Sequence, residues 1–293
     1  MSKSTEQPLL WHYTSFEVLI SIFKKESVPV MRATHIDFLN DKSELKYGLS
    51  RIIDSLNDDN DNETIGKCLK ERELLVAIGE TLGLHFSAVD TRDFLALKED
   101  VKNIYERVVI EQLISTTPDF YTFSLSTAPD SLYQWLAYSS QQGGIALVFH
   151  NFTSLVDIVD DSKYRHQLIN TVSKVDYLKI GDNVDIKLSN VSGSKLDYLA
   201  SNAILIKHPA YEQEKEYRLM VNLSNEEKGS IPIHYDASKP YIELPFDPIL
   251  LKEIYISPRG EKDQSEKLVQ HFLSNTPCLS HVKIFVSDIP YRG

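Results

Sequence analysis

Three short polar segments, each embedded in a strand-like apolar context, constrain the fold more than any other feature of this chain. They are residues 10–14 (LWHYT), 121–126 (YTFSLS) and 214–218 (EKEYR), and long stretches of sequence separate them. Because a strand turns alternate side chains to one face, polar residues two apart should point together. The predicted pairs are His12 with Thr14, Ser124 with Ser126, and Glu214 with Glu216. A sheet that brings the three segments together would assemble one polar site.

The rest of the chain mixes strand and helix patterns without internal repeats. Helical spacing of apolar residues predicts helices over residues 15–25, 130–140, 195–207 and 261–274. Alternating or β-branched runs predict strands over residues 28–34, 121–126, 145–150, 172–179, 217–223, 231–235, 241–244, 253–257 and 282–286. Many short strands with few regular helical crossovers favour an α+β fold over a doubly wound parallel sheet.

The sequence predicts a single elaborated α+β domain over residues 1–293, because no linker clearly divides it. Residues 63–115 carry apolar side chains at helical spacing among many charges, and residues 54–64 are rich in Asp and Asn. We therefore expect residues 54–117 to form a mainly helical insertion that begins with a solvated loop.

Charge and composition exclude several classes of protein. The net charge of −11 opposes nucleic acid at long range, so the chain has no strong nucleic-acid signature. No apolar run is long enough to span a bilayer, and the polar start lacks the apolar core of a signal peptide. Two cysteines far apart, Cys68 and Cys278, form neither a disulfide framework nor a thiolate metal site. These features predict a cytoplasmic protein without a membrane partner.

Several familiar catalytic motifs are missing from the sequence. It contains no G-x-G-x-x-G fingerprint, no phosphate-binding P-loop and no G-x-S-x-G nucleophile elbow. No two of the nine histidines stand two or four residues apart, so one element cannot offer two histidine ligands to a metal. We therefore expect no metal cofactor.

Several short motifs follow one another in a fixed order along the chain. They are His12-Tyr13-Thr14, the turn Leu39-Asn40-Asp41 with Glu44, Phe123-Ser124-Leu125-Ser126, Trp135 with Tyr138, Gly143-Gly144, and Glu214-Lys215-Glu216-Tyr217-Arg218. Their order resembles that of family 2971 of the bacterial domains of unknown function. The resemblance extends from Trp11 to the strand at residues 253–257 and leaves the predicted insertion unmatched. It implies a bacterial origin.

That family is in turn distantly similar to ADP-ribosyltransferases, which hold NAD on a split, mostly antiparallel sheet with flanking helices. Their three motifs hold a His or Arg, then a Ser-Thr-Ser or Tyr segment, then a catalytic Glu that is often part of Glu-x-Glu. In this chain the matching residues are His12 for the first motif, Ser124 and Ser126 for the second, and Glu216 with Glu214 for the third. Leu125 stands where the second motif has Thr.

The resemblance implies an NAD-consuming enzyme, either a transferase acting on an unknown acceptor or an NAD glycohydrolase. An intracellular toxin or a phage-defence effector is the role expected of it. The implied catalytic residues are Glu216 and Glu214. The implied NAD-binding residues are His12, Tyr13, Thr14, Ser124, Ser126, Trp135 and Tyr138.

Glutamates suit this chemistry, because cleavage of the bond between ribose and nicotinamide develops an oxocarbenium ion. A carboxylate such as Glu216 can stabilise that positive charge, as paired acids do in glycoside cleavage. A second carboxylate nearby can serve as the base for an incoming nucleophile. His12 would bind hydroxyls of the adenosine ribose, and the Ser124 and Ser126 hydroxyls would orient the nicotinamide half.

Simpler explanations exist for each of these residues. A lone His near a strand end can be a structural hydrogen-bonding residue. Glu-x-Glu followed by Arg218 can be a solvated strand face with a cross-strand ion pair. Ser124 and Ser126 can form the outward face of an edge strand. Trp135, Tyr138 and Tyr211 can be packing residues, and Asn40 and Asp41 ordinary turn formers.

Two other function classes stay open beside the NAD-consuming enzyme. A non-catalytic ligand-binding or interaction module would need only the acidic surface. A metal-dependent nuclease would need clustered acids and a lysine around a divalent ion. Gln213 stands two residues before Lys215, where nucleases of this kind carry an acid, so the nuclease is the weakest of the three.

Overall fold

The structure is a computed structural model that describes residues 8–23, 28–39, 44–55, 119–150, 171–182, 184, 195–223, 231–236 and 239–291. Apart from its first two residues, the predicted insertion at 54–117 lies outside the described residues, and so does the turn at Asn40 and Asp41. The chain divides into two compact units, each described here by itself. The first comprises Met1–Phe38, Asp119–Val175 and Ala210–Gly293, and the second comprises Leu39–Pro118 and Asp176–Pro209. The prediction of a single domain stays a prediction.

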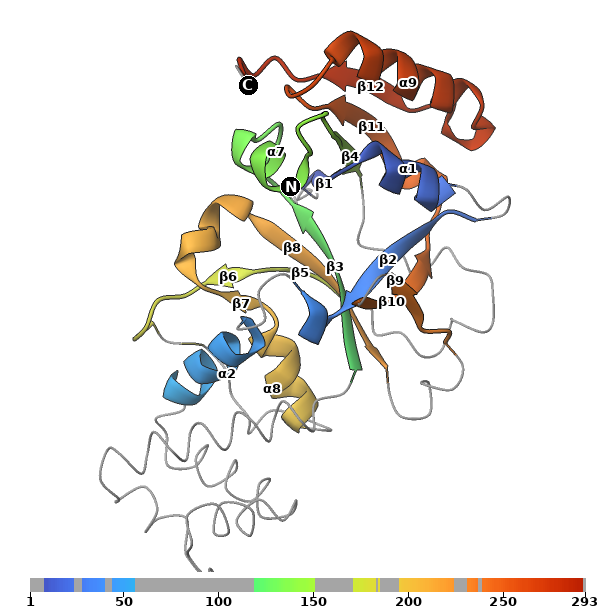
Figure 1. Cartoon of the computed structure of the whole chain (residues 1–293). Coiled ribbons are helices and arrows are strands. Elements are labelled where there is room, and N and C mark those ends of the chain that lie inside the picture. The colour runs from blue at the N-terminus through green and yellow to red at the C-terminus, as the bar shows by residue number, and fades with distance from the viewer. Residues whose placement is uncertain are drawn as a thin grey trace, which may run out of the picture. The chain divides into compact units, whose positions relative to one another are not determined.

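The first unit contains a ten-stranded, mostly antiparallel sheet with helices against it, which confirms the α+β prediction (Figure 1). Its main path runs β12-β11-β4-β1-β3-β2-β10-β9, and β8 pairs with both β3 and β5. Among the described strands of this sheet, β11 and β12 alone pair in parallel. The strands are β1 (Leu10–Thr14), β2 (Val30–His35), β3 (Asp119–Ser126), β4 (Ile145–Phe149), β5 (Thr171–Lys174), β8 (Glu216–Leu223), β9 (His234–Asp236), β10 (Lys239–Pro245), β11 (Leu251–Ile256) and β12 (Lys283–Val286).

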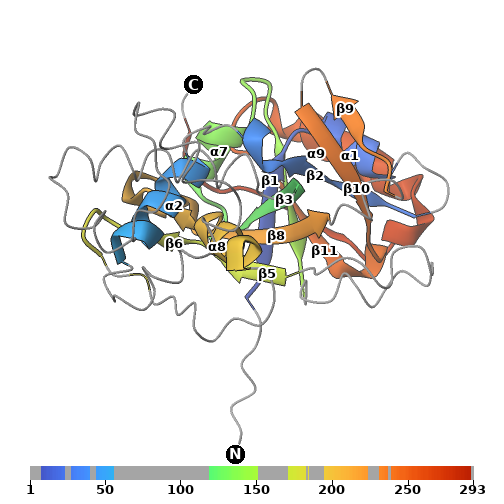
Figure 2. The same ribbon diagram turned by 90° about the horizontal axis from the view of Figure 1, so that it is seen from below.

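The sheet splits at β3. β8 pairs with all eight residues of β3 and so occupies one of its two edges. The other edge pairs with β1 at Ser126 and with β2 at Tyr121 and Thr122. The strands β1 and β2 therefore reach the same edge of β3 on either side of Ser124. Figure 2 shows β3 among β1, β2 and β8 from below.

Helices cover both faces of the sheet near β1 and β4. The helices α1 (Phe16–Phe23) and α9 (Lys262–Ser274) bury Leu19, Ile22 and Val269 in the main apolar core, together with alternate residues of the strands. On the other face, Trp135 of α7 (Leu132–Tyr138) packs with Trp11, Tyr13, Ala146 and Val148. All five residues of β4 are buried, which explains why its sequence, IALVF, is an unbroken apolar run.

The second unit contains α2 (Glu44–Ser55), α8 (Lys195–Ala203) and a short parallel pair, β6 (Asp176–Tyr177) with β7 (Ile206–Lys207). The helices pack closely at Gly48, where an added Cβ would lie 2.0 Å from the carbonyl oxygen of Ala203. A buried ion pair joins Lys207 Nζ to Glu44 Oε1 at 3.0 Å. Sequence alone did not predict α2.

Most predicted elements match the structure, and three differ at points where tertiary pairing changes. The strand predicted at 172–179 is interrupted at Val175, because β5 pairs with β8 whereas β6 pairs with β7. The helix predicted at 195–207 ends at Ala203, and its last two residues form β7. The strand predicted at 231–235 is β9, shifted towards the C-terminus. None of the described helices is long and apolar enough to cross a membrane.

Candidate functional site

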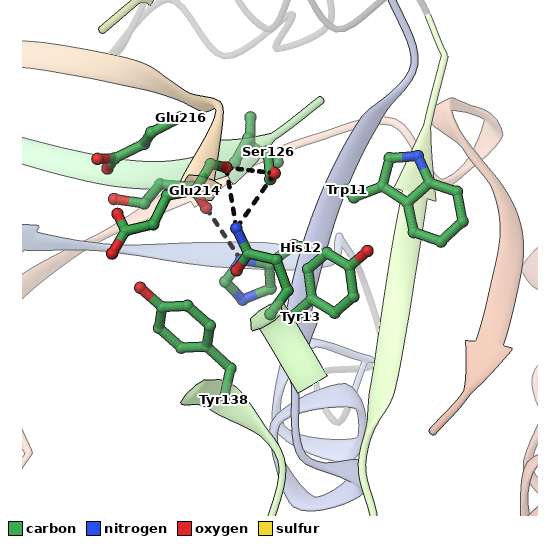
Figure 3. A pocket seen from close by; sticks show the side chains of 10 residues that line it. Trp11, His12, Tyr13, Ser126, Tyr138, Glu214 and Glu216 are labelled. Carbon is green, nitrogen blue, oxygen red and sulfur yellow. Dashed lines mark hydrogen bonds between the residues drawn. The ribbon is translucent and has the colours of Figure 1, made fainter. Parts of the chain in front are cut away.

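A small pocket in the first unit brings together side chains from all three polar segments (Figure 3). We call it the acid pocket; its lining residues are Trp11, His12, Tyr13, Ser124, Leu125, Ser126, Gln134, Tyr138, Glu214 and Glu216. Its volume is about 70 Å³. One water needs roughly 10–15 Å³ on this measure, so the pocket has room for a few waters or a group of similar size.

The acid pocket lies at the split in the sheet, and His12 closes part of the gap. In the antiparallel pairing Trp11 lies opposite Ser126, so these two side chains share a face and His12 points to the other face. There its ring packs on Phe123 with the centroids 4.4 Å apart. Its Nδ1 lies 3.1 Å from the carbonyl oxygen of Ser124. His12 thus reaches the pocket through the gap between β1 and β3, which strand alternation alone does not predict.

The hydrogen bond to Ser124 determines the tautomer of His12. A carbonyl oxygen only accepts, so Nδ1 carries the proton, and Nε2 of the neutral ring is an acceptor. Burial lowers the pKa of His12 to about 4, although the hydrogen bond to the Ser124 carbonyl acts in the opposite direction. At neutral pH His12 is therefore an uncharged acceptor, suited to a ligand hydroxyl.

We expect His12 to lower the stability of the fold as the pH falls from about 6.5 to about 4. In this window the unfolded chain, with the ordinary histidine pKa of 6.5, binds a proton that the folded chain resists. Nitrogen NMR of labelled protein at pH 6 should show a neutral ring protonated at Nδ1. In urea denaturation, His12→Gln should lose this part of the pH dependence. A ring already charged at pH 6 would contradict the assignment.

Ser126 is a structural anchor for the turn that carries Glu214. Its hydroxyl donates to the carbonyl oxygen of Glu214 at 2.6 Å and accepts from the backbone N–H of Ala128 at 3.0 Å. The buried Gln134 amide donates to the same carbonyl at 2.9 Å and to the Ser126 hydroxyl at 3.3 Å (Figure 3). Sequence reasoning missed Gln134, because no motif distinguishes it from other polar residues of a short helix.

Glu214 does not lie on a strand, so the predicted alternation with Glu216 is wrong. Glu214 ends a 3-10 helix, η4 (Pro209–Glu214), and β8 begins only at Glu216. Lys215 between them has a φ of +44°, in the left-handed region. Its carbonyl oxygen accepts from the backbone N–H of Thr127 at 3.0 Å. This turn, held by the end of β3, brings both carboxylates into one pocket.

Lys215 has a left-handed backbone conformation. The effect of a substitution there on the free energy of unfolding should therefore depend on whether the new residue tolerates a positive φ. Lys215→Gly should change the free energy of unfolding by less than about 1 kcal/mol, since glycine adopts this φ without strain. Lys215→Val should cost more than about 1 kcal/mol, because a β-branched side chain is poorly tolerated at positive φ. Urea denaturation of both variants tests this. Equal stability of the two variants would show that the turn relaxes.

Glu216 forms a buried, two-pronged ion pair with Arg218 in the same strand. Arg218 Nε donates to Oε1 at 2.8 Å and Nη2 donates to Oε2 at 2.9 Å. Only 4% of Glu216 and 1% of Arg218 are exposed, and Glu214 is 8% exposed. The alternative of a solvated strand face is therefore wrong. Such a pair fixes the orientation of the carboxylate.

The aromatic residues near the acid pocket have different roles. The Tyr13 hydroxyl donates to the carbonyl oxygen of Ala128 at 2.6 Å and accepts from the backbone N–H of Ser131 at 3.0 Å. Burial raises the pKa of Tyr13 well above its ordinary value. Tyr138 is 42% exposed, and its hydroxyl points towards the Glu214 carboxylate (Figure 3). Tyr13 thus holds the loop before α7, whereas Tyr138 offers an accessible ring.

Two residues implied as NAD-binding do not line the acid pocket. Trp135 is fully buried; its ring meets that of Tyr13 edge-on at 4.8 Å, and its Nε1 donates to Asp130 Oδ1 at 2.8 Å. Its core position corrects the expectation of a direct contact with ligand and leaves it a packing role. Thr14 is 9% exposed and pairs with Ile145 in the sheet. Tyr211 is likewise not among the lining residues.

Within the described part of the chain, no three His, Cys, Asp or Glu side chains cluster in a way that could hold a metal ion. The acid pocket itself offers two carboxylates and one imidazole, and Arg218 already binds both oxygens of Glu216.

Comparison with known proteins finds one similarity. The model of a family described as "Protein of unknown function (DUF2971)" matches residues 134–219. This stretch contains Gln134, Tyr138, Glu214, Glu216 and Arg218, but neither β1 nor β3. No curated protein and no solved structure shows a significant match. Residues 134–219 are thus similar to this family of unknown function, and the similarity includes both acids of the pocket.

Proposed function

We propose that this protein is an NAD-consuming enzyme of the ADP-ribosyltransferase type, whose reaction takes place in the acid pocket. One observation carries the proposal: a buried carboxylate clamped by arginine, Glu216, shares a small pocket with a second buried carboxylate and a neutral histidine. Cleavage of the nicotinamide–ribose bond needs a fixed negative charge beside the carbon that becomes cationic. Glu216 supplies that charge.

In the proposed reaction the bond between ribose C1′ and the nicotinamide nitrogen breaks, and its electron pair leaves with neutral nicotinamide. Glu216 stabilises the positive charge that develops on the ribose. Water or another nucleophile then bonds to C1′ and releases a proton to Glu214. Nε2 of His12 accepts a hydrogen bond from a ribose hydroxyl, and the exposed ring of Tyr138 packs on the nicotinamide.

Glu214 acts only in the second step, in which the nucleophile bonds to C1′. Substitutions of Glu214 and Glu216 should therefore affect the reaction differently. Glu214→Gln should reduce transfer to an acceptor more than it reduces hydrolysis of NAD, because the leading acid faces the nucleophile. Assays of nicotinamide release with and without acceptor give the two rates. Glu212→Gln is the matched control, since Glu212 is exposed on the same 3-10 helix and does not line the pocket. Equal losses of both rates would contradict separate roles.

The proposal is tested by incubating the purified protein with NAD and measuring free nicotinamide and ADP-ribose by chromatography. We expect equal amounts of the two products in water, and less free ADP-ribose when cell extract supplies acceptors. NAD with the carbocyclic ribose, which cannot form an oxocarbenium ion, should bind without turnover. Absence of nicotinamide release under all these conditions would overturn the enzyme assignment and favour a ligand-binding module.

A further inference from the structure

Asp130 joins the helix α7 to a distant part of the same unit. Its carboxylate accepts two hydrogen bonds: Oδ1 from the indole N–H of Trp135 at 2.8 Å, and Oδ2 from the hydroxyl of Ser287 at 3.1 Å. Trp135 belongs to α7, whereas Ser287 follows directly after β12. One side chain therefore fastens the start of the helix to a segment 157 residues further along the chain.

The backbone of Asp130 is held in an unusual conformation. Its φ of +37° is positive, which is uncommon for any residue other than glycine. Such a conformation persists only where the surrounding contacts impose it, and these cases are concentrated at functional sites. The loop before α7 has such contacts on both sides of Asp130, because the Tyr13 hydroxyl bonds the backbone of Ala128 and of Ser131.

Arg259 fastens the other end of α7. Its Nη1 donates to the carbonyl oxygen of Ser139, the C-cap of the helix, at 3.1 Å. Its guanidinium carbon lies over the ring of Tyr291, 5.4 Å from the centroid, where the face of the ring attracts the positive charge. Tyr291 and Ser287 belong to the same segment after β12, so this segment reaches both ends of α7 (Figure 1).

We call residues 287–291 the support segment. Ser287 is 2% exposed; its N–H donates to the carbonyl oxygen of Ile256 at 3.0 Å, and its own carbonyl accepts from Lys262 Nζ at 2.8 Å. These bonds fix it to β11 and α9. Ile289 packs against the apolar cluster that α7 shares with β1 and β4. The support segment is thus itself anchored and can hold α7 in place.

The position of α7 matters because the helix carries two lining residues of the acid pocket, Gln134 and Tyr138. Gln134 also donates to the carbonyl oxygen of Glu214. A helix of seven residues is too short to be stable without tertiary contacts. Its placement therefore depends on what fastens its two ends, and those ends are fastened by Asp130 and Arg259.

We infer that Asp130 and Arg259 are positioning residues, which fasten α7 to the support segment and so hold Gln134 and Tyr138 at the acid pocket. Neither Asp130 nor Arg259 lines the pocket. The effect on the pocket depends on geometry alone, whereas the effect on turnover rests on the proposed function. Loss of the attachment should weaken ligand binding more than the chemical step, because Glu216 lies on β8 and not on α7.

The first test measures hydrogen exchange by NMR, without any ligand, at the backbone amides of α7 and the side-chain amide of Gln134. Asp130→Gly removes both side-chain bonds and keeps the positive φ without strain. We expect these groups to exchange at least about tenfold faster than in wild type. Asp130→Asn should restore most of the protection, since its amide can accept from Trp135 and donate to the Ser287 hydroxyl.

Asp247→Gly is the matched control. The half-buried Asp247 accepts from the backbone N–H of Ile249 at 2.8 Å in another turn of the same unit. It should leave exchange in α7 unchanged. Arg259→Met should speed exchange at the end of the helix that carries Tyr138. Ser287→Ala removes only the bond to Asp130 Oδ2 and leaves the turn intact, so it replaces Asp130→Gly if that variant does not fold.

The second test separates positioning from mere loss of folded protein. With NAD as substrate, Asp130→Gly and Arg259→Met should raise KM by about tenfold and keep kcat within about threefold. Partial unfolding would instead lower kcat at an unchanged KM, because fewer molecules would be active. That kinetic pattern would overturn the inference, and so would exchange in α7 and at Gln134 that neither substitution changes.

Failure of the proposed function gives a different result. Wild type would then release no nicotinamide from NAD, while the exchange of α7 and of the Gln134 amide would still respond to Asp130→Gly and not to Asp247→Gly. Equal exchange in the Asp130→Gly and Asp247→Gly variants would contradict the positioning role whether or not NAD is consumed.

Discussion

Glu216→Gln is expected to reduce the rate of nicotinamide release by a factor of about a hundred or more, because it removes the charge that stabilises the oxocarbenium-like transition state. Ground-state binding of NAD should change far less. Glutamine keeps the size of the side chain and an acceptor for one Arg218 N–H. Rates should be measured together with melting curves, because loss of the buried pair also lowers stability.

Glu212→Gln again provides the matched control and should keep the wild-type rate, because Glu212 lies outside the acid pocket. A rate for Glu216→Gln that stays within about threefold of wild type, in a folded protein, would rule out the catalytic role even if NAD is consumed.

Arg218→Met is expected to lower the free energy of unfolding by about 3–5 kcal/mol, because it removes both hydrogen bonds that the Arg218 guanidinium donates to the buried Glu216 carboxylate. The double variant Glu216→Gln with Arg218→Met should recover a large part of this loss, since neither charge of the buried pair then remains. Urea denaturation of the single and double variants measures the coupling between the two residues.

A second ion pair in the same unit serves as the control. Arg32 Nη1 lies 3.1 Å from Asp236 Oδ2, and the two side chains are 40% and 68% exposed. Arg32→Met should therefore cost no more than about 1 kcal/mol, as is usual for surface pairs. Similar losses for Arg32→Met and Arg218→Met would show that burial does not govern the strength of the Glu216–Arg218 pair.

Local sequence determined most of the secondary structure. The alternation in residues 121–126 matches β3. Ser124 and Ser126 share one face of this strand and pair with Arg218 and Glu216 of β8. The unbroken apolar run at residues 145–149 matches a strand covered on both faces. The helical spacing after Glu261 matches α9. These patterns succeed because burial on one or two faces leaves a periodicity that can be recognised in the sequence itself.

Tertiary structure alone decided how the acid pocket is assembled. Glu214 reaches it from a 3-10 helix through the left-handed Lys215, held by Ser126 at a separation of 88 residues. His12 lies on the face opposite to Trp11 and Ser126, and its ring bonds the carbonyl oxygen of Ser124, 112 residues away, through the split in the sheet. The role of Gln134 follows only from its hydrogen bonds to the Ser126 hydroxyl and the Glu214 carbonyl oxygen.

Local sequence patterns predict the strands and helices but not the assembly of the acid pocket, for a physical reason. Strand and helix periodicity arises from contacts that each residue makes with one side of its own element, so a window of about ten residues contains it. The orientation of the two acids depends on hydrogen bonds between segments that the chain brings together only on folding. Those bonds compete with local strand geometry at Glu214 and override it. No local pattern in the sequence records which distant carbonyl a buried hydroxyl or amide will bind.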